Sequence, residues 1–299
     1  MRAWTSARWA LPLPDDHRFP MAKYSMVRDE VLARGLLSAS AVVEPDRVSE
    51  DALALVHHRS YIDAVVGDGL SPGDLRRLGF PWSPELGERS LRTVQGTVEA
   101  VRDALNSGAG INLAGGTHHA YPDHGEGFCV FNDVAVAIRV LRREGRITRS
   151  AIVDLDVHQG NGTAAIFADD PAVFTFSMHG ARNYPFHKER SRLDVELEDG
   201  CGDAGFLPLL ERHLDRVLDE AGPDLVIYIA GADPYAGDRL GRLALSIEGL
   251  GRRDIMVFAA CRRRRIPVAV VLGGGYASNL EDVVAIHANT FAALQDHLA

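Results

Sequence analysis

A run of acidic and basic side chains follows an apolar segment in the middle of the chain. Residues 151–153 are Ala-Ile-Val and predict a buried strand, and Asp154, Asp156 and His158 come after them at every second position. Alternate side chains of an extended chain point to the same face. Two carboxylates and an imidazole at one strand end are suitable ligands for a divalent metal ion. Because these groups would be costly to bury without a charge to pair with, the run predicts a metal site.

A third candidate ligand, Asp233, follows a separate apolar strand at 225–230. Asp156, His158 and Asp233 together would leave one coordination position for water, which is typical of a catalytic metal site. The alternative for Asp233 is a turn residue before Pro234. For Asp156 and His158 it is a buried hydrogen-bonded network.

Two adjacent histidines, His118 and His119, follow the short apolar segment 111–114. Beside a metal ion, such a pair favours a general acid/base and an electrostatic partner. Each imidazole would need an orienting group, and Asp154 and Asn161 are available near the predicted metal. Two structural histidines are the alternative.

Glycines precede two further candidates. Tyr276 follows three glycines, which allow close backbone approach, and its phenol could donate to an oxyanion. Gly127 and Phe128 could line a narrow apolar slot. The alternatives are a glycine-rich turn with a surface tyrosine and ordinary core packing. No Lys-Ser/Thr follows the glycines before Tyr276, so a phosphate loop is not favoured.

Apolar strands alternate with amphipathic helices along the chain. This alternation predicts an α/β fold with a mostly parallel central sheet and helices on both faces. Ligands bind such sheets at the carboxyl ends of the strands, which is where the polar clusters fall. Helices are predicted over about 88–106, 132–144, 205–221, 247–263 and 280–294, and strands over about 111–114, 151–155, 172–176, 225–230 and 267–272.

Composition limits the classes of function. A chain of 299 residues with 46% hydrophobic content can form one α/β domain over 1–299, and we find no linker within it. The net charge of −9 argues against nucleic acid or an anionic membrane as a partner. The basic run 262–265 lies where a helix is expected to end, where cations are favourable. Three cysteines, an odd number without a CxxC pair, and the lack of a long apolar segment favour a soluble, cytoplasmic protein.

These motifs, in this order, resemble the histone deacetylase superfamily, which shares its fold with arginase. The chain is most similar to class IV enzymes and their bacterial relatives, and the resemblance runs from His17 to Tyr276. The segments that carry it are Gly-Gly-Thr-His-His-Ala, Gly-Phe-Cys, Asp-Leu-Asp-Val-His-Gln-Gly-Asn-Gly and Gly-Ala-Asp-Pro.

The resemblance implies an arginase/deacetylase-like fold and a zinc ion bound by Asp156, His158 and Asp233, although the residues alone also allow another divalent metal. The family often carries a potassium ion near the 154–158 segment, and Ser177 is at a matching position.

The resemblance also implies catalytic roles. His119 would be the general base and acid, and His118, paired with Asp154, an electrostatic helper. Tyr276 would stabilise the tetrahedral intermediate. Residues 127–128, Gly and Phe, would form a wall of an acyl-lysine tunnel.

Two positions depart from many members of the family. Asn161 stands where many have Asp, although class IV enzymes also have Asn there. A neutral amide should stabilise the His119 imidazolium less than a carboxylate would. The second aromatic wall of the tunnel is not evident, because residues 177–180 lead into a divergent loop that contains Tyr184 and Phe186.

The sequence therefore predicts a zinc-dependent hydrolase of N-acyl amines. The substrate could be an N-acylated lysine peptide, a polyamine or a small molecule, and the oligomeric state is open. One alternative is a ureohydrolase of the arginase type, which would need two metals and more acidic ligands. Another is a non-catalytic module that binds acylated ligands.

Overall fold

The centre of the molecule is a sheet of eight strands in the order β2-β1-β3-β8-β7-β4-β5-β6. The computed structural model describes residues 1–14, 16–67 and 69–298. Each pair of neighbouring strands is parallel. The strands are β1 (Ala3–Trp4), β2 (Val42–Val43), β3 (Ala109–Asn112), β4 (Ser150–Asp154), β5 (Val173–Gly180), β6 (Leu193–Leu197), β7 (Leu225–Ile229) and β8 (Val268–Val271).

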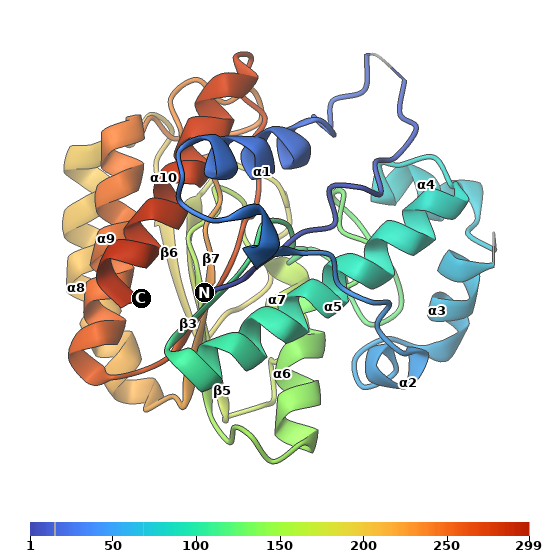
Figure 1. Cartoon of the computed structure of the whole chain (residues 1–299), viewed down its shortest axis with the longest axis horizontal. Coiled ribbons are helices and arrows are strands. Elements are labelled where there is room, and N and C mark those ends of the chain that lie inside the picture. The colour runs from blue at the N-terminus through green and yellow to red at the C-terminus, as the bar shows by residue number, and fades with distance from the viewer. Residues whose placement is uncertain (15, 68, 299) are drawn as a thin grey trace.

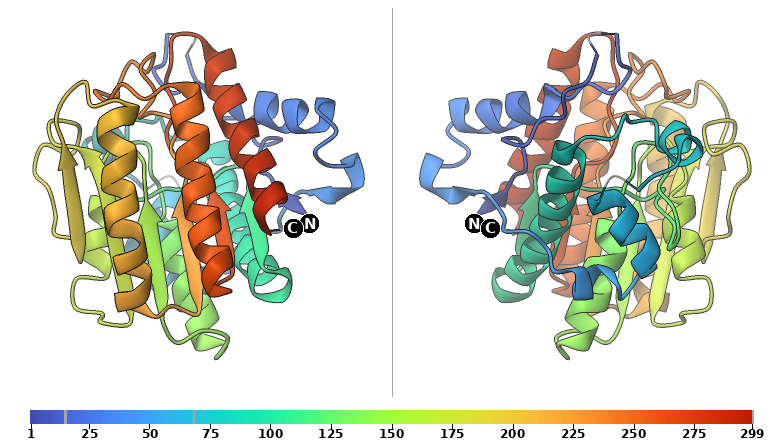
Figure 2. Two further views of the ribbon diagram at one scale, coloured as in Figure 1. Left: turned by 90° about the vertical axis from the view of Figure 1, so that its left-hand side faces the viewer. Right: turned by 90° about the vertical axis from the view of Figure 1, so that its right-hand side faces the viewer.

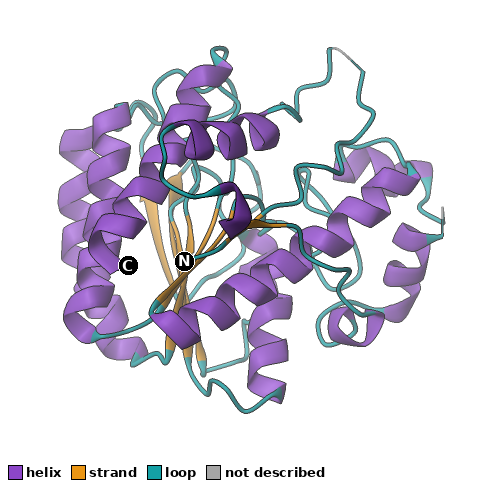
Figure 3. Cartoon of the chain, viewed as in Figure 1, coloured by secondary structure: helices purple, strands orange, loops and turns teal. Residues whose placement is uncertain are grey.

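Helices cover both faces of this sheet (Figures 1 and 3). Three long helices lie side by side on one face, and α5 and α6 lie on the other (Figure 2). The long helices of the first face are α8 (Asp203–Ala221), α9 (Ile247–Arg264) and α10 (Leu280–Leu298). The remaining helices are α1 (Lys23–Ala33), the 3₁₀ helix η1 (Ala39–Ala41), α2 (Glu50–Leu53), α3 (Arg59–Val66), α4 (Pro72–Leu78), α5 (Pro84–Ser107), α6 (Asp133–Arg143) and α7 (Asn161–Ile166).

Alternate strand residues divide the interior into two cores. Val153 and Tyr228 pack in the core beneath α8, α9 and α10, whereas Ile152 and Ile227, one position earlier, pack in the core beneath α5 and α6. Each fully buried side chain of this size contributes about 1.5–3 kcal/mol to stability. This alternation explains why consecutive residues of the central strands β7 and β8 are apolar: both faces of the sheet are covered.

Four neighbouring strands end at the same level. Asn112 of β3 pairs with Val271 of β8, Val271 pairs with Ile229 of β7, and Ile229 pairs with Asp154 of β4. The segments that follow these residues therefore leave the sheet side by side at its carboxyl edge. These are the four segments that carry the predicted polar clusters.

The structure confirms the predicted fold class and extends it. The sequence did not predict β1 and β2, which are two residues long, or the edge strand β6, which is half-buried and mixes polar with apolar residues. It also did not predict α1–α4. Helix α5 starts four residues before the predicted position of 88, because Ser83 caps it and Pro84 fits the first turn.

None of the helices in residues 1–14, 16–67 and 69–298 is both long and apolar enough to cross a membrane. The single domain expected over 1–299 stays a prediction, and its last residue, Ala299, lies outside the described residues.

Candidate active site

A buried group of three potential metal ligands lies at the carboxyl edge of the sheet. Asp156, His158 and Asp233 each offer one ligand atom, and these atoms lie within 4.8 Å of one another. His158 Nδ1 is 3.0 Å from Asp156 Oδ1 and 3.2 Å from Asp233 Oδ2. The backbone N–H groups of Val157 and Gly274 donate to the carboxylates of Asp233 and Asp156 and fix their orientation.

The sequence predicted that Asp154, Asp156 and His158 lie on one face of an extended strand, and this prediction was wrong. β4 ends at Asp154, and the next residues turn, with the N–H of Asp156 donating to Asp154 and the N–H of His158 donating to Asp156. Aspartate side chains favour such local turns by accepting from backbone two residues on. As a result, Asp154 faces His118, and Asp156 and His158 face Asp233.

The charges of the three groups fit a divalent cation. Burial and the neighbouring Asp156 carboxylate raise the pKa of Asp233 to about 7. Burial opposes the charge on His158, but Asp156 and Asp233 outweigh it and raise the pKa of this imidazole to about 10. Asp233 Oδ2 is buried and has no hydrogen-bond partner among the described residues. The carboxylates of Asp156 and Asp233 face a single positive charge, that of the protonated His158. A divalent metal ion would balance both carboxylates and would displace the proton from the histidine.

The glycines before Tyr276 let the backbone pass close to these carboxylates. A Cβ added at Gly274 would lie 1.8 Å from Asp233 Oδ2, and one at Gly273 would lie 2.8 Å from Asp156 Oδ2. No side chain fits within these distances. The Gly274 N–H can therefore donate directly to Asp156, at 2.7 Å.

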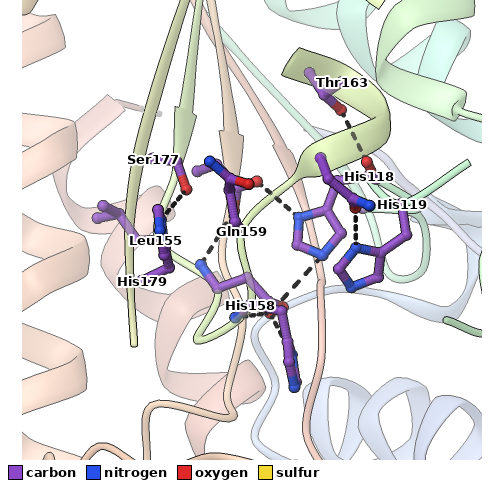
Figure 4. Close-up of polar contacts among 12 residues, drawn as sticks. His118, His119, Leu155, His158, Gln159, Thr163, Ser177 and His179 are labelled. Carbon is purple, nitrogen blue, oxygen red and sulfur yellow. Dashed lines mark hydrogen bonds and ion pairs between the residues drawn. The ribbon is translucent and has the colours of Figure 1, made fainter. Parts of the chain in front are cut away.

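The loop that carries the two histidines is anchored from beneath. The first residue of α6, Asp133, accepts hydrogen bonds from the N–H groups of Gly116 and Thr117, at 3.1 and 2.8 Å. Thr163 of α7 donates from its N–H to the carbonyl oxygen of His118. Its hydroxyl donates to the same oxygen (Figure 4). Asn132 donates to the carbonyl oxygen of Ala120, so the loop is held on both sides of the histidine pair.

His118 pairs with a carboxylate. Its Nδ1 is 2.7 Å from Asp154 Oδ2, and both side chains are buried. Burial opposes a charge on this imidazole, but Asp154 and Asp156 outweigh it and raise the pKa of His118 to about 9. The raised pKa favours the charged form of His118 near neutral pH.

His119 pairs with an amide instead. Its Nδ1 is 2.6 Å from Asn161 Oδ1. Asn161 Nδ2 donates to Glu126 Oε1 at 2.6 Å, and because a carboxylate only accepts, this contact fixes which way the amide points. Asn161 Oδ1 must then accept from His119 Nδ1, so a neutral His119 has no proton on Nε2. Burial, His118 and His158 all lower the pKa of His119 well below its ordinary value, consistent with a neutral imidazole.

Tyr276 lies at the side of the cluster. Its ring is buried and lies 6.4 Å from the ring of His158. Asp238 accepts from the Tyr276 N–H and holds its backbone. The ammonium group of Lys23 lies 5.1 Å from the centre of the Tyr276 ring and donates to the carbonyl of Gly273. A buried lysine beside the candidate oxyanion donor is a feature that the sequence analysis did not single out.

Two aromatic side chains flank the approach to the site. Phe128 has a left-handed φ of +66°, which is unusual for a bulky residue, and its ring lies 6.0 Å from that of Tyr276. The second ring belongs to Tyr184, whose centre lies 5.0 Å from that of His119. A Cβ added at Gly127 would lie 3.0 Å from the Tyr184 ring, so the passage between these residues is narrow. Tyr184 is the second wall that could not be identified from the sequence.

The passage opens into a larger cavity of about 720 Å³ that reaches His119, His158 and Tyr276. Below it, a small cavity of about 40 Å³ is lined by these residues together with Lys23. Most of the residues predicted for the site line the small cavity: His118, His119, Gly127, Phe128, Asp156, His158 and Tyr276. Asp154, Asn161 and Asp233 do not line it, but each lies within 3.2 Å of one of its histidines. Ser177 lies in β5 opposite Asp154, with its hydroxyl 2.9 Å from His179 Nδ1, and the potassium ion that the resemblance implies there stays a prediction.

A covered parallel sheet with a buried carboxylate–histidine cluster at its carboxyl edge defines an α/β protein with a candidate metal centre. The histone deacetylase domain model matches residues 17–291. The chain is 32% identical to histone deacetylase 2 of Arabidopsis thaliana, covering 90% of this chain and 72% of that protein. It is 45% identical to an uncharacterized protein of Picosynechococcus over 96% of both chains. The chain belongs to the histone deacetylase family.

More distant proteins agree with this assignment. An acetoin utilization protein, AcuC, of Staphylococcus aureus is 29% identical over 88% of this chain and 73% of its own length. The crystal structure of the HDA15 HD domain superposes with a TM-score of 0.83 over 99% of this chain and 91% of that domain, at 22% identity, which shows the fold. The protein is therefore a deacetylase-like hydrolase of this family.

Proposed function

We propose that this protein hydrolyses an N-acyl amine, such as an acyl-lysine, with zinc as its metal. The observation that carries the proposal is the unequal pair of histidines beside the metal ligands. His118 faces a carboxylate, which favours its charged form, and His119 faces an amide oxygen, which favours a neutral imidazole with Nε2 free. One fixed charge and one available base are what hydrolysis of an amide requires.

Asp156, His158 and Asp233 would hold the ion. When bound, it supplies a Lewis acid that polarises the acyl carbonyl group and makes a water molecule more acidic. An open position fits this donor set, because three protein ligands leave room for water and substrate.

The chain's own groups would move the protons. His119 Nε2 takes a proton from the attacking water, and its Nδ1–H stays on Asn161 Oδ1. The Tyr276 hydroxyl donates to the oxygen of the acyl group as negative charge develops there. The proton taken by His119 then passes to the leaving amine, so that amide and water give a carboxylate and a free amine.

The walls of the passage would select the shape of the substrate. Phe128 and Tyr184 leave a narrow apolar slot above His119, which suits an unbranched alkyl chain such as the lysine side chain. The charged ends of a substrate would then remain in the outer cavity. We also propose a cytoplasmic location, because Cys129, Cys201 and Cys261 are free thiols.

The test is turnover by purified protein with measured metal content, compared with His119→Ala. The panel contains acetyl-lysine and longer acyl-lysine peptides, acetylated polyamines and arginine. We expect release of an acyl group from at least one N-acyl amine, with about one metal ion per chain, and loss of turnover in His119→Ala. Release of urea from arginine would show a ureohydrolase instead. Binding without turnover in the fully metallated protein would show a binding module.

A further inference from the structure

Six arginine side chains surround the cavity that leads to the candidate active site. They come from four separate segments of the chain: the loop before α1, the end of α4, the loop after β5 and the loop after β7. All six are exposed. We call this ring of side chains the mouth of the cavity, and it consists of Arg18, Arg76, Arg77, Arg182, Arg239 and Arg242.

The positive charge around the cavity is opposite in sign to the net charge of the whole protein, which is −9. The chain has 41 acidic and 32 basic side chains, yet no carboxylate side chain is among the described residues that line the cavity. Within the described part of the chain, Arg182 and Arg242 are the mouth arginines with an ion-pair partner, and they share Asp199. Among the described residues, the nearby Asp238 carboxylate does not form an ion pair with these arginines; instead it accepts hydrogen bonds from three backbone N–H groups.

Hydrogen bonds hold the segments of the mouth around the passage. The carbonyl of Arg77 accepts from the N–H of Gly127, next to the tunnel wall. Asn183 joins the two loops by donating to the carbonyl of Leu240 and accepting from the N–H of Arg242. Arg239 Nε donates to the carbonyl oxygen of Tyr276, at 2.9 Å. Two of the segments that carry mouth arginines are therefore joined directly to residues of the site, through the Arg77 carbonyl and the Arg239 side chain.

The helix dipole explains the positions of only two of the six mouth arginines. Arg76 and Arg77 lie in the last turn of α4, where a cation is favoured by the helix dipole. The other four lie in loops, where no such effect operates. Six arginines around one opening produce a local positive potential that attracts anions and repels cations.

We propose that the substrate of this enzyme carries carboxylate groups close to the acylated amine, and that the mouth arginines select it. This inference rests on the proposed hydrolysis of N-acyl amines. It excludes acetylated polyamines as preferred substrates, because their free ammonium groups would lie among the arginines. Two sources have the required chemistry: an acyl-lysine peptide with neighbouring Asp or Glu residues, and free Nε-acyl-lysine with its own α-carboxylate.

The experiment compares three acetyl-lysine pentapeptides that differ only in flanking residues, which are Asp, Gly or Lys. Free Nε-acetyl-lysine and its α-amide form a second pair, and acetylspermidine is included. We expect kcat/KM to be about 10-fold higher for the Asp peptide than for the Gly peptide at low salt, mainly through KM, and lower still for Lys. A similar difference between acetyl-lysine and its amide would identify the small molecule as a sufficient source.

The variant Arg76→Gln/Arg77→Gln tests the arginines directly. It should remove most of the preference for Asp over Gly and leave kcat for the Gly peptide unchanged. The matched control is Arg262→Gln/Arg265→Gln, which removes the same charge from exposed residues that line a separate cavity with Pro267, next to the start of β8. The control should keep the preference.

Failure of this inference is distinct from failure of the proposed function. Equal kcat/KM for the Asp, Gly and Lys peptides would overturn the selection by arginines while the hydrolase remained established. Faster turnover of acetylspermidine than of any acidic substrate would also overturn it. If no peptide is hydrolysed, fluorescence anisotropy of the labelled peptides still tests the mouth, because tighter binding of the Asp peptide than of the Gly peptide must then disappear in Arg76→Gln/Arg77→Gln.

Discussion

The floor and the mouth of the candidate active site differ in burial: side chains of the floor are buried, and those of the mouth are exposed to solvent. The floor consists of buried groups at the ends of central strands, where Asp233 is 0% exposed and Asp156 is 1% exposed. The mouth consists of exposed arginines on loops and on one helix end. Groups of the floor are fixed by backbone hydrogen bonds and can tolerate little change, whereas those of the mouth contact water and can vary. We therefore propose that the floor sets the rate of the reaction and the mouth selects the substrate.

The largest effect should follow from a change to the metal ligands of the floor. Asp233→Asn removes a charge from a site where two carboxylates face one cation. We expect metal content, measured by atomic emission, to fall from about one ion per chain to near zero, and turnover to fall to that of the metal-free protein. Asp219→Asn, an exposed residue of α8, should retain both. A metallated, active Asp233→Asn protein would remove this residue from the ligand set.

A large effect should also follow from loss of the Tyr276 hydroxyl. Removal of one oxyanion donor typically lowers kcat by about 10² to 10³. Tyr276→Phe should show this loss for every substrate of the panel, with unchanged metal content and retained substrate binding. The comparison variant is Tyr228→Phe, whose hydroxyl donates to Asp254 in the core. That variant should lose stability in a thermal melt instead, and an unchanged rate in Tyr276→Phe would contradict the proposed role.

A smaller effect, visible mainly as a pH shift, should separate the two histidines. Asn161→Asp places a carboxylate beside His119 and raises the pKa of its imidazole. Because His119 must be neutral to accept a proton, the acidic limb of the kcat/KM profile should move to higher pH. Glu126→Gln should lower kcat by several-fold, because the Asn161 amide could then turn and lose its fixed direction. Profiles with the same acidic limb in Asn161→Asp and wild type would argue against His119 as the base.

The smallest effect should come from salt, and it should be confined to the mouth. Raising NaCl from about 50 to 500 mM shortens the Debye length from roughly 14 to 4 Å and screens exposed charges more than buried ones. We expect kcat/KM for the Asp-flanked peptide to fall several-fold through KM, and kcat for the Gly-flanked peptide to stay constant. A parallel decrease for both substrates would show that the floor and the mouth do not act separately.

Most of the floor could be predicted from the sequence. Asp156, His158 and Asp233 follow apolar strands, and parallel sheets gather the segments after their strands at one edge. The order of the motifs added the resemblance on which the family assignment was first made. The path of the chain at the site was not predicted correctly, because aspartates at a strand end can turn the backbone, and β4 stops at Asp154.

The mouth could not be predicted in the same way. Tyr184 and the arginines lie in loops whose direction depends on contacts between distant segments, such as Asn183 with Leu240. Glu126 was part of a glycine-rich segment with no periodicity, and only its contact with Asn161 shows that it directs the amide. Lys23 lies about 250 positions from Gly273, to which it donates.

The sequence by itself determined the fold class, the family and the identities of the residues of the floor. Those depend on local patterns: apolar strands, glycines and polar groups at strand ends, which have few arrangements once the sheet is parallel. Only the tertiary structure decided that Tyr184 forms the second wall of the passage, that Glu126 directs the Asn161 amide, and that six arginines share one opening. These properties depend on contacts between loops from separate parts of the chain, such as Asn183 with Leu240, and local spacing does not encode such contacts.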